Sequence, residues 1–161
     1  MDKKLLKQLN DQINKEMDSM YVYFAMAAYL EANNWPGFGA WMQKQSTEEM
    51  GHVMKIYRFI NDRGDQVVLD SIEKPAATYK SVKDVFQKAL AHEKKITVSI
   101  NKLVDAARAS DDKATEIFLQ WFVTEQVEEE KSVGDVLTAL EMVKDAPGAL
   151  IMLDHQLGAR Q

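Results

Sequence analysis

The chain has 161 residues, of which 46% are hydrophobic and 28% charged, a composition typical of a single folded domain with a substantial core. Its formal net charge of -5 argues against nucleic acid as a partner, because phosphate binding requires clustered Lys and Arg side chains. The absence of cysteine excludes disulfides, thiolate metal sites and thiol nucleophiles, so carboxylate oxygen and imidazole nitrogen would have to hold any metal ion.

The N-terminal sequence MDKKLLKQLNDQ has no apolar core of signal-peptide length, and no later run is apolar enough to span a bilayer. We therefore expect a cytoplasmic protein that has no membrane partner. Glycine and proline divide the chain into long helical segments. The first covers residues 3–32 and is ended by NNWPGFG, and the second covers residues 36–63 and ends at Gly64.

The next stretch has no sustained helical period and contains Pro75, which indicates a connection. Ser81, with Asp84 three residues later, is typical of a helix N-cap and predicts a third helix over residues 81–109. A fourth helix is expected over residues 111–144. Pro147 and Gly148 then precede a tail long enough for a short fifth helix over residues 147–157.

Four helices of this length predict an all-α four-helix bundle. Short links make the first and second helices antiparallel neighbours, and the third and fourth likewise. The connection of about 16 residues could extend roughly 50 Å, enough to run the whole length of a helix. The second and third helices would then be parallel and joined by one long crossover.

The buried stripe of each helix can be read from alternating steps of three and four residues. Each stripe carries at least one carboxylate near its middle. The carboxylate and imidazole members are Glu16, Glu49, His52, Glu93, Glu125 and Glu129, and the stripe of the second helix also contains Gln45. For the fourth helix the expected stripe is Phe118, Phe122, Glu125, Glu129, Ser132, Val136 and Ala139.

Height along the bundle gives an independent test. Measured from a turn centred near Asn34, Glu16 lies 18 residues before it and Glu49 and His52 lie 15 and 18 after it. Measured from Asp111, the same offsets fall on residues 93, 126 and 129. The six side chains should therefore lie in one layer, contributed by two pseudo-equivalent hairpins.

Converging buried carboxylates repel one another, so without a counter-charge most would be protonated at neutral pH. A Glu-x-x-His motif that occurs alone is more often a coincidence on a solvated helix face. In the complete layer, however, Glu49 and His52 share a helix face and can bind one divalent ion. Glu49 can also bridge to a second ion held by Glu93 and Glu129, which predicts a dinuclear metal site.

The segments LNDQINKEMDSMYVYFAM, QSTEEMGHVM, AHEKKIT and LQWFVTEQVEEEK make the chain resemble the bacterial non-haem ferritins over nearly its whole length. The resemblance implies a ferritin-like bundle with a short fifth helix in a hollow homo-oligomeric shell of 24 subunits. It also implies a ferroxidase that oxidises Fe(II) with dioxygen or hydrogen peroxide and stores the ferric mineral. Iron would be bound at two positions per subunit, with a third position nearby, and haem is not expected.

Residue by residue, the resemblance assigns the first iron to Glu16, Glu49 and His52 and the second to Glu49, Glu93 and Glu129. Gln126 would support the centre, and Tyr23 matches a redox-active tyrosine, although packing is an equally good explanation for it. The additional iron position would be formed by Glu48, Glu125, Glu128 and Glu129.

Two alternatives remain at this point. A bacterioferritin would bind haem through a residue such as Met50, but those proteins repeat Glu-x-x-His where this chain has Gln126-x-x-Glu129. We therefore expect Met50 to pack at an interface. The other alternative is a non-catalytic helical interaction bundle whose charged residues are solvated. His92 and His155 should be surface or packing residues, and Glu116 a surface acid rather than part of an iron channel.

Overall fold

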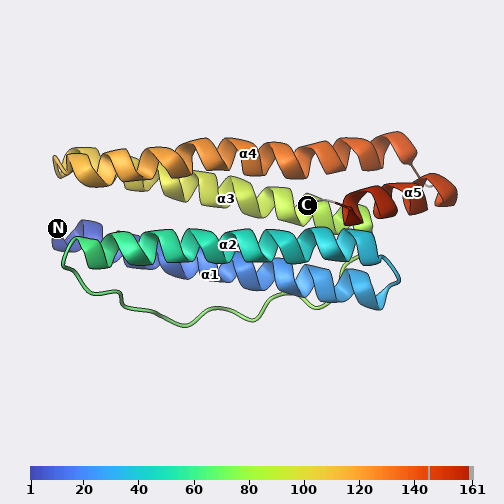
Figure 1. Cartoon of the computed structure of the whole chain (residues 1–161), viewed down its shortest axis with the longest axis horizontal. Coiled ribbons are helices and arrows are strands. Elements are labelled where there is room, and N and C mark those ends of the chain that lie inside the picture. Colours follow the sequence, from blue (N-terminus) through green and yellow to red (C-terminus); the bar gives the residue numbers. More distant parts are fainter. Residues whose placement is uncertain (145, 160–161) are drawn as a thin grey trace.

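The computed structural model shows five helices packed as a long bundle, and it describes residues 1–144 and 146–159 (Figure 1). Within these residues there is no strand, and no helix is both long enough and apolar enough to cross a membrane. The helices are α1 (Lys3–Ala32), α2 (Pro36–Asp62), α3 (Val82–Ala109), α4 (Lys113–Val143) and α5 (Pro147–Gly158).

The topology is the one expected from the link lengths. The α1 and α2 helices lie side by side and antiparallel, as do α3 and α4, and residues 64–81 run along the outside of α1 for the length of the bundle (Figure 1). Because this crossover returns the chain to the end where α2 begins, α2 and α3 are parallel. The predicted four-helix bundle with one long crossover and a short fifth helix is thereby confirmed.

Side-chain caps and left-handed turn residues fix the helix ends. The Asp2 carboxylate accepts hydrogen bonds from two backbone N–H groups of α1, and the Ser81 hydroxyl accepts one from Asp84. In the turn between α3 and α4, Asp111 adopts a positive φ of 53° and the Asp112 carboxylate caps α4. For this reason α4 begins at Lys113, two residues later than the sequence suggests.

The crossover has no neighbouring strand, so side chains of α1 satisfy part of its backbone. Asn10 Oδ1 accepts a hydrogen bond from the Val68 N–H at 2.8 Å, and Asn14 Oδ1 accepts one from the Asp70 N–H at 3.0 Å. Further along, the Tyr29 hydroxyl donates to the Tyr79 carbonyl at 2.8 Å. These contacts hold an extended segment against the outer face of α1.

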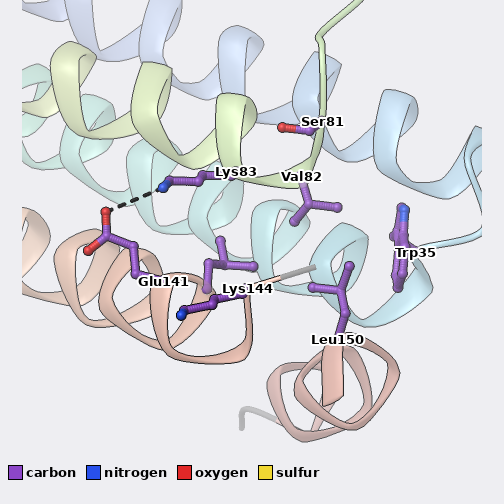
Figure 2. Close-up of a pocket in the computed structure, with 8 residues that line it drawn as sticks. Trp35, Ser81, Val82, Lys83, Glu141, Lys144 and Leu150 are labelled. Atoms are coloured by element: carbon purple, nitrogen blue, oxygen red, sulfur yellow. Dashed lines mark ion pairs between the residues drawn. The ribbon is translucent and has the colours of Figure 1, made fainter. Parts of the chain in front are cut away.

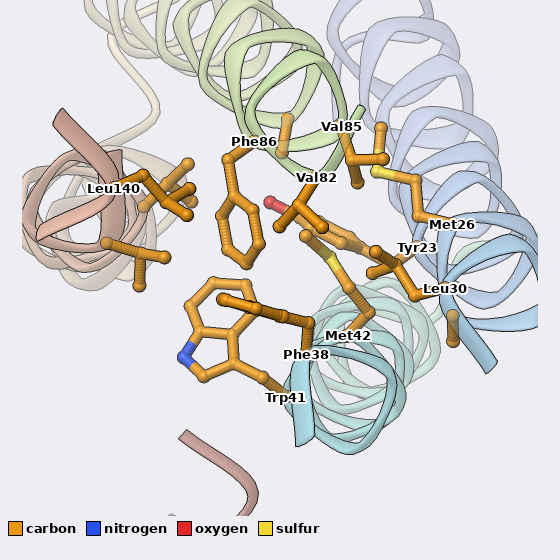
Figure 3. Packing of buried hydrophobic residues seen from close by; sticks show 14 of the residues in the cluster. Tyr23, Met26, Leu30, Phe38, Trp41, Met42, Val82, Val85, Phe86 and Leu140 are labelled. Carbon is orange, nitrogen blue, oxygen red and sulfur yellow. The ribbon is translucent and has the colours of Figure 1, made fainter. Parts of the chain in front are cut away.

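The apolar core is divided into two clusters. One, around Tyr23, Phe38 and Phe86, fills the end of the bundle nearest α5 (Figure 3). The other, around Leu9, Ile56 and residues of α3 and α4, fills the opposite end. Buried polar side chains occupy the height between the clusters, so the fold encloses a polar layer in the middle of an otherwise apolar interior.

The short α5 helix closes one end of the bundle by docking on the start of α2. The buried Asp154 carboxylate accepts a hydrogen bond from the Phe38 N–H at 2.8 Å, which caps α2 from a distant part of the chain. Between α5 and the adjoining ends of α3 and α4 lies a cavity of about 490 Å³, with the Lys83–Glu141 ion pair at its rim (Figure 2). Its lining includes none of the predicted metal ligands.

Candidate metal centre

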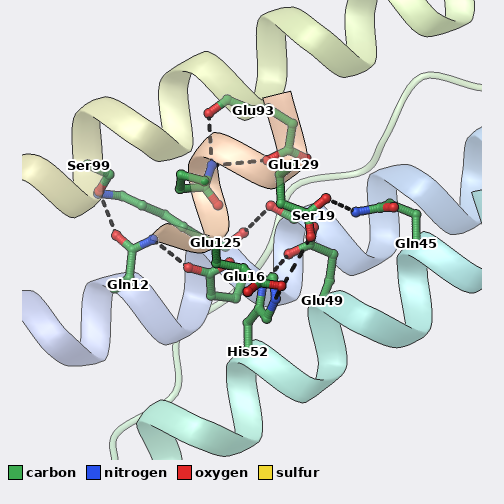
Figure 4. A network of polar contacts seen from close by, with 12 residues as sticks. Gln12, Glu16, Ser19, Gln45, Glu49, His52, Glu93, Ser99, Glu125 and Glu129 are labelled. Carbon is green, nitrogen blue, oxygen red and sulfur yellow. Dashed lines mark hydrogen bonds and ion pairs between the residues drawn. The ribbon is translucent and has the colours of Figure 1, made fainter. Parts of the chain in front are cut away.

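The polar layer contains the five side chains predicted to be ligands of the dinuclear site. Glu16, Glu49, His52, Glu93 and Glu129 are each between 1% and 5% exposed. They come from all four long helices, and their side chains point toward one another in the interior of the bundle (Figure 4). This burial contradicts the alternative of a solvated charged face.

The buried stripe of α4 differs from the one expected from the sequence. The buried residues of α4 are Leu119, Phe122, Gln126, Glu129, Val133, Val136 and Leu140, together with Thr115 near its start. The expected stripe shares Phe122, Glu129 and Val136 with this set, but its other members lie one residue away and are only half-buried. The apolar face of α4 is wide enough for both choices, and contacts with α3 bury the Gln126 side of it.

The ligand atoms form two overlapping groups. Carboxylate oxygens of Glu16 and Glu49 and a ring nitrogen of His52 lie within 4.8 Å of one another, as do oxygens of Glu49, Glu93 and Glu129. Glu49 belongs to both groups. This is the arrangement in which one carboxylate can bridge two cations, each also held by ligands of its own.

The His52 ring has carboxylates on both of its nitrogens. Nδ1 lies 3.2 Å from Glu49 Oε2 and 3.8 Å from Glu16 Oε2. On the other side, Nε2 lies 3.8 Å from Glu125 Oε1 and 4.0 Å from Glu129 Oε1. Nδ1 is therefore the atom available to a cation in the first group, while Nε2 faces the carboxylates of α4.

Neutral donors surround the ligands, and two of them have no role predicted from the sequence. Gln126 Nε2 donates to Glu93 Oε2 at 3.2 Å, and the Tyr23 hydroxyl donates to Glu93 Oε1. These two are Gln12, whose Nε2 donates to Glu16 Oε1 at 2.7 Å, and Gln45, which donates to Glu129 Oε2. Gln45 lies on the expected stripe of the second helix, and the spacing of Gln12, four residues before Glu16 on the same helix face, is the signal that could have identified it.

Burial and mutual repulsion leave protons in this layer when no cation is bound. Burial raises the pKa of Glu49 well above its ordinary 4.5, and the charges of Glu93 and Glu16 raise it further. Burial likewise raises the pKa of Glu93, and it raises that of Glu129 to about 7. Burial lowers the pKa of His52, but its contacts with Glu16 and Glu49 more than offset this and bring it to about 11.

The donor set fits a hard or borderline divalent cation. Among the described residues, the buried Glu16 Oε2 atom has no hydrogen-bond partner, which is unusual for a buried carboxylate oxygen. Carboxylate oxygens with a single imidazole suit iron, manganese or zinc better than cuprous copper. Cation binding would replace the protons and relieve the repulsion between the carboxylates.

The residues of the expected additional position are only partly brought together. Glu125 and Glu129 form a third group with His52, in which Glu125 is half-buried. Glu48 is half-buried and Glu128 exposed, and neither belongs to any ligand cluster in residues 1–144 and 146–159. Trp121 packs edge-on against His52 with centroids 5.5 Å apart, and Lys55 Nζ lies 3.9 Å from its ring centroid.

The other residues considered lie away from the ligand groups. Glu116 pairs with Arg108 at 2.6 Å, as expected of a surface acid. His92 Nε2 lies 2.7 Å from Ser19 Oγ, and His155 is exposed on α5. Met50 is 42% exposed on α2, which leaves its packing at a subunit interface a prediction.

Comparison with known proteins places this geometry in context. A family model described as the ferritin-like domain matches residues 6–143. The bacterial non-heme ferritins of Staphylococcus epidermidis and Staphylococcus aureus are 38% and 37% identical to the chain over 160 residues, covering 99% of this chain and 96% of each relative. Among solved structures, an open pore ferritin from the hyperthermophilic archaeon Archaeoglobus fulgidus has a TM-score of 0.99 and 39% identity, covering 100% of this chain and 99% of that chain.

Proposed function

Because the chain belongs to the ferritin family, its function is iron storage, and we propose that each subunit oxidises Fe(II) at the buried carboxylate layer before the ferric product is stored. The storage compartment in this proposal is the interior of a homo-oligomeric shell, with 24 subunits as the expected number. Iron is the substrate and cargo of this reaction, and dioxygen or hydrogen peroxide is the oxidant.

The observation that carries the proposal is the pair of ligand groups that share Glu49. Two Fe(II) ions held so close together can each give up one electron. The two electrons together match the reduction of dioxygen to hydrogen peroxide, or of hydrogen peroxide to water. A centre that binds two ferrous ions at once thus avoids releasing a one-electron reduction product of oxygen.

The ligand set also suits a centre that passes its product on. Carboxylates stabilise Fe(III) because they are hard anionic ligands, but only one imidazole is present and flexible glutamates can rearrange. The pair of carboxylates Glu125 and Glu129, on the Nε2 side of His52, lies beside the centre and offers a third position. We propose this group as a stopping place between oxidation and storage, with Glu48 and Glu128 further along the same route.

The test is ferrous oxidation by the purified protein, followed by stopped-flow absorbance of the ferric product. Replacing the shared ligand in Glu49→Gln keeps the shape of the side chain but removes the bridging charge. We expect oxidation to slow at least about tenfold, since each such ligand contributes several kcal/mol to cation binding or charge stabilisation.

A matched control is Asp135→Asn, which makes the same kind of change on the exposed face of α4, where Asp135 pairs with Lys131. This variant should oxidise iron at the parent rate. If the double variant Glu49→Gln/His52→Ala also oxidised iron at the parent rate, the proposed site would be wrong.

A further inference from the structure

A chain of hydrogen bonds ends on Glu16, and none of its other members belongs to the ligand groups. Gln12 is fully buried on α1, four residues before Glu16, and its Nε2 donates to Glu16 Oε1 at 2.7 Å. Its own Oε1 accepts from Ser99 Oγ of α3 at 2.6 Å (Figure 4). Ser99 Oγ in turn accepts from Lys15 Nζ at 2.6 Å. The chain therefore runs from an exposed ammonium group to a buried ligand.

The chemistry of the two ends fixes the direction of every bond between them. An ammonium group can only donate, so the Ser99 hydroxyl accepts from Lys15 and uses its hydrogen for Gln12 Oε1. The amide oxygen of Gln12 is thereby committed to Ser99, and its NH₂ group must face Glu16. An amide flip would place the amide oxygen of Gln12 against the Glu16 carboxylate, with two acceptors facing each other, so Glu16 determines the orientation of Gln12.

This arrangement makes the two oxygens of Glu16 unequal. Oε1 is occupied by the Gln12 amide. Oε2 is buried, has no hydrogen-bond partner among the described residues, and lies 3.8 Å from His52 Nδ1. One oxygen is thus held by the protein while the other is presented to the first ligand group, where Glu49 and His52 also point.

We propose that Gln12, oriented by Ser99 and Lys15, is a positioning residue that makes Glu16 a one-oxygen ligand and so sets the affinity of the first cation position. The inference rests on the proposed function, because it assumes that a cation binds between Glu16, Glu49 and His52. Gln12 does not touch the cation itself. It acts by fixing which carboxylate oxygen is free and where that oxygen points.

The experiment uses Co²⁺, which serves as a spectroscopic probe, titrated into the assembled protein without oxidant. Gln12→Leu removes the donor at nearly constant volume and should weaken the first cobalt about tenfold to a hundredfold, the range typical of lost partners of metal ligands. The visible absorption bands of the bound Co²⁺ should also change in this variant, because Glu16 becomes free to rotate and use both oxygens. Ser99→Ala should act in the same direction, whereas Ser99→Thr keeps the hydroxyl and should restore parent affinity.

Asn10→Leu is the matched control, since Asn10 is another buried amide of α1 but binds the crossover backbone at Val68. It should lower the melting temperature without changing cobalt affinity or the spectrum. Unchanged affinity and bands in Gln12→Leu would overturn the inference, as would an equal loss of affinity in Asn10→Leu. If Gln12→Leu fails to fold, the comparison of Ser99→Ala with Ser99→Thr decides in the same way. A parent protein that binds no cobalt would instead contradict the proposed function.

Discussion

His52 shows how a single residue connects the two sides of the polar layer. Its Nδ1 faces Glu16 and Glu49, while its Nε2 faces Glu125 and Glu129. A cation bound at Nδ1 would leave Nε2 as a donor toward the α4 carboxylates, and such an outer partner fixes the ring orientation of a metal-binding histidine. Glu125 Oε1, at 3.8 Å from Nε2, is the nearer of the two carboxylates that could take this place.

The raised pKa values in this layer predict how the cation-free protein responds to pH. The pKa of Glu129 rises from 4.5 to about 7 and that of His52 from 6.5 to about 11, and burial raises those of Glu49 and Glu93. The folded state thus binds more protons than the unfolded state. The stabilising contribution of Glu129 is complete below its ordinary 4.5 and is lost as the pH rises through about 7, and that of His52 is lost between 6.5 and about 11.

We therefore expect chelator-treated protein to melt at progressively lower temperature as the pH rises from about 5 to about 8. Saturating Zn²⁺ should remove most of this dependence, because a cation replaces the protons. Glu129→Gln, which cannot ionise, should flatten the part of the curve near neutral pH. A melting temperature that rises with pH in the cation-free protein would show that the layer does not retain protons.

Packing alone does not decide whether Tyr23 takes part in the oxidation. Its hydroxyl is fully buried and donates to Glu93, and burial raises its pKa well above 10, so the phenol stays protonated. Tyr23→Phe should slow ferrous oxidation by about tenfold, since it removes a donor from a metal ligand. If the residue is also redox-active, a tyrosyl radical signal should appear by electron paramagnetic resonance during turnover in the parent and be absent in the variant.

Tyr29→Phe serves as the comparison, because Tyr29 lies on the same helix but donates to the crossover carbonyl of Tyr79. It should leave both the oxidation rate and the radical signal unchanged. Parent-like rates in Tyr23→Phe would reduce Tyr23 to a packing residue.

At the scale of the helices, α5 depends on two glycines for its close approach to α2. A Cβ at Gly37 would lie 1.7 Å from the Asp154 carbonyl oxygen, and a Cβ at Gly158 would lie 2.9 Å from the Gly37 Cα. Backbone packs directly on backbone here, which no side chain larger than hydrogen permits. The contact also brings Asp154 to the Phe38 N–H and supplies the cap that the start of α2 needs.

Gly37→Ala should therefore displace α5 and remove the Asp154 cap, destabilising the protein by about 1–3 kcal/mol, the usual range for overpacking. Gly134→Ala is the control, since a Cβ there meets nothing within 4 Å. That substitution should stabilise α4 by roughly 0.5–1 kcal/mol, because alanine loses less backbone entropy in a helix. Chemical denaturation of both variants gives the comparison, and equal stability would mean that α5 is not tightly docked.

Sequence periodicity predicted the helices and their order well because each long helix has one strongly apolar side. It was weaker where a helix is apolar over a wide face, as in α4, where Phe118 and Glu125 were chosen over their buried neighbours Leu119 and Gln126. The expected and observed stripes still share the positions seven residues apart, Phe122, Glu129 and Val136. Glu129 was therefore placed on the core side despite the error.

The partners of the ligands could not be predicted in the same way. Gln12 contacts Ser99, which is 87 residues away in the chain, and Gln45 contacts Glu129, which is 84 residues away. Helix rotation and the relative heights of α1, α2, α3 and α4 decide such contacts, and spacing within one helix contains neither. The crossover contacts of Asn10 and Asn14 were hidden for the same reason, because the extended segment has no period of its own.

For the whole molecule, the outer face of α1 carries exposed aromatic side chains beside the crossover. Phe24 is 59% exposed and Tyr21 40%, and together with the crossover segment around Pro75 they line a groove of about 650 Å³. Exposed aromatic clusters of this kind usually mark protein interfaces. In the proposed shell, this face would be covered by another copy of the chain.

Phe24→Asp places a charge in that groove and should cause the assembly to separate into smaller species, which light scattering coupled to size-exclusion chromatography would measure. Val98→Asp is the matched control, since Val98 is 53% exposed but is flanked on α3 by the lysines at positions 94, 95 and 102. The predicted ligands of each centre all come from one chain, so separated Phe24→Asp subunits should still bind Co²⁺ and oxidise Fe(II). They should fail to keep the ferric product in solution, because a mineral core needs an enclosing shell. Retained storage by the small species would contradict this division between a site within the subunit and a compartment made by the assembly.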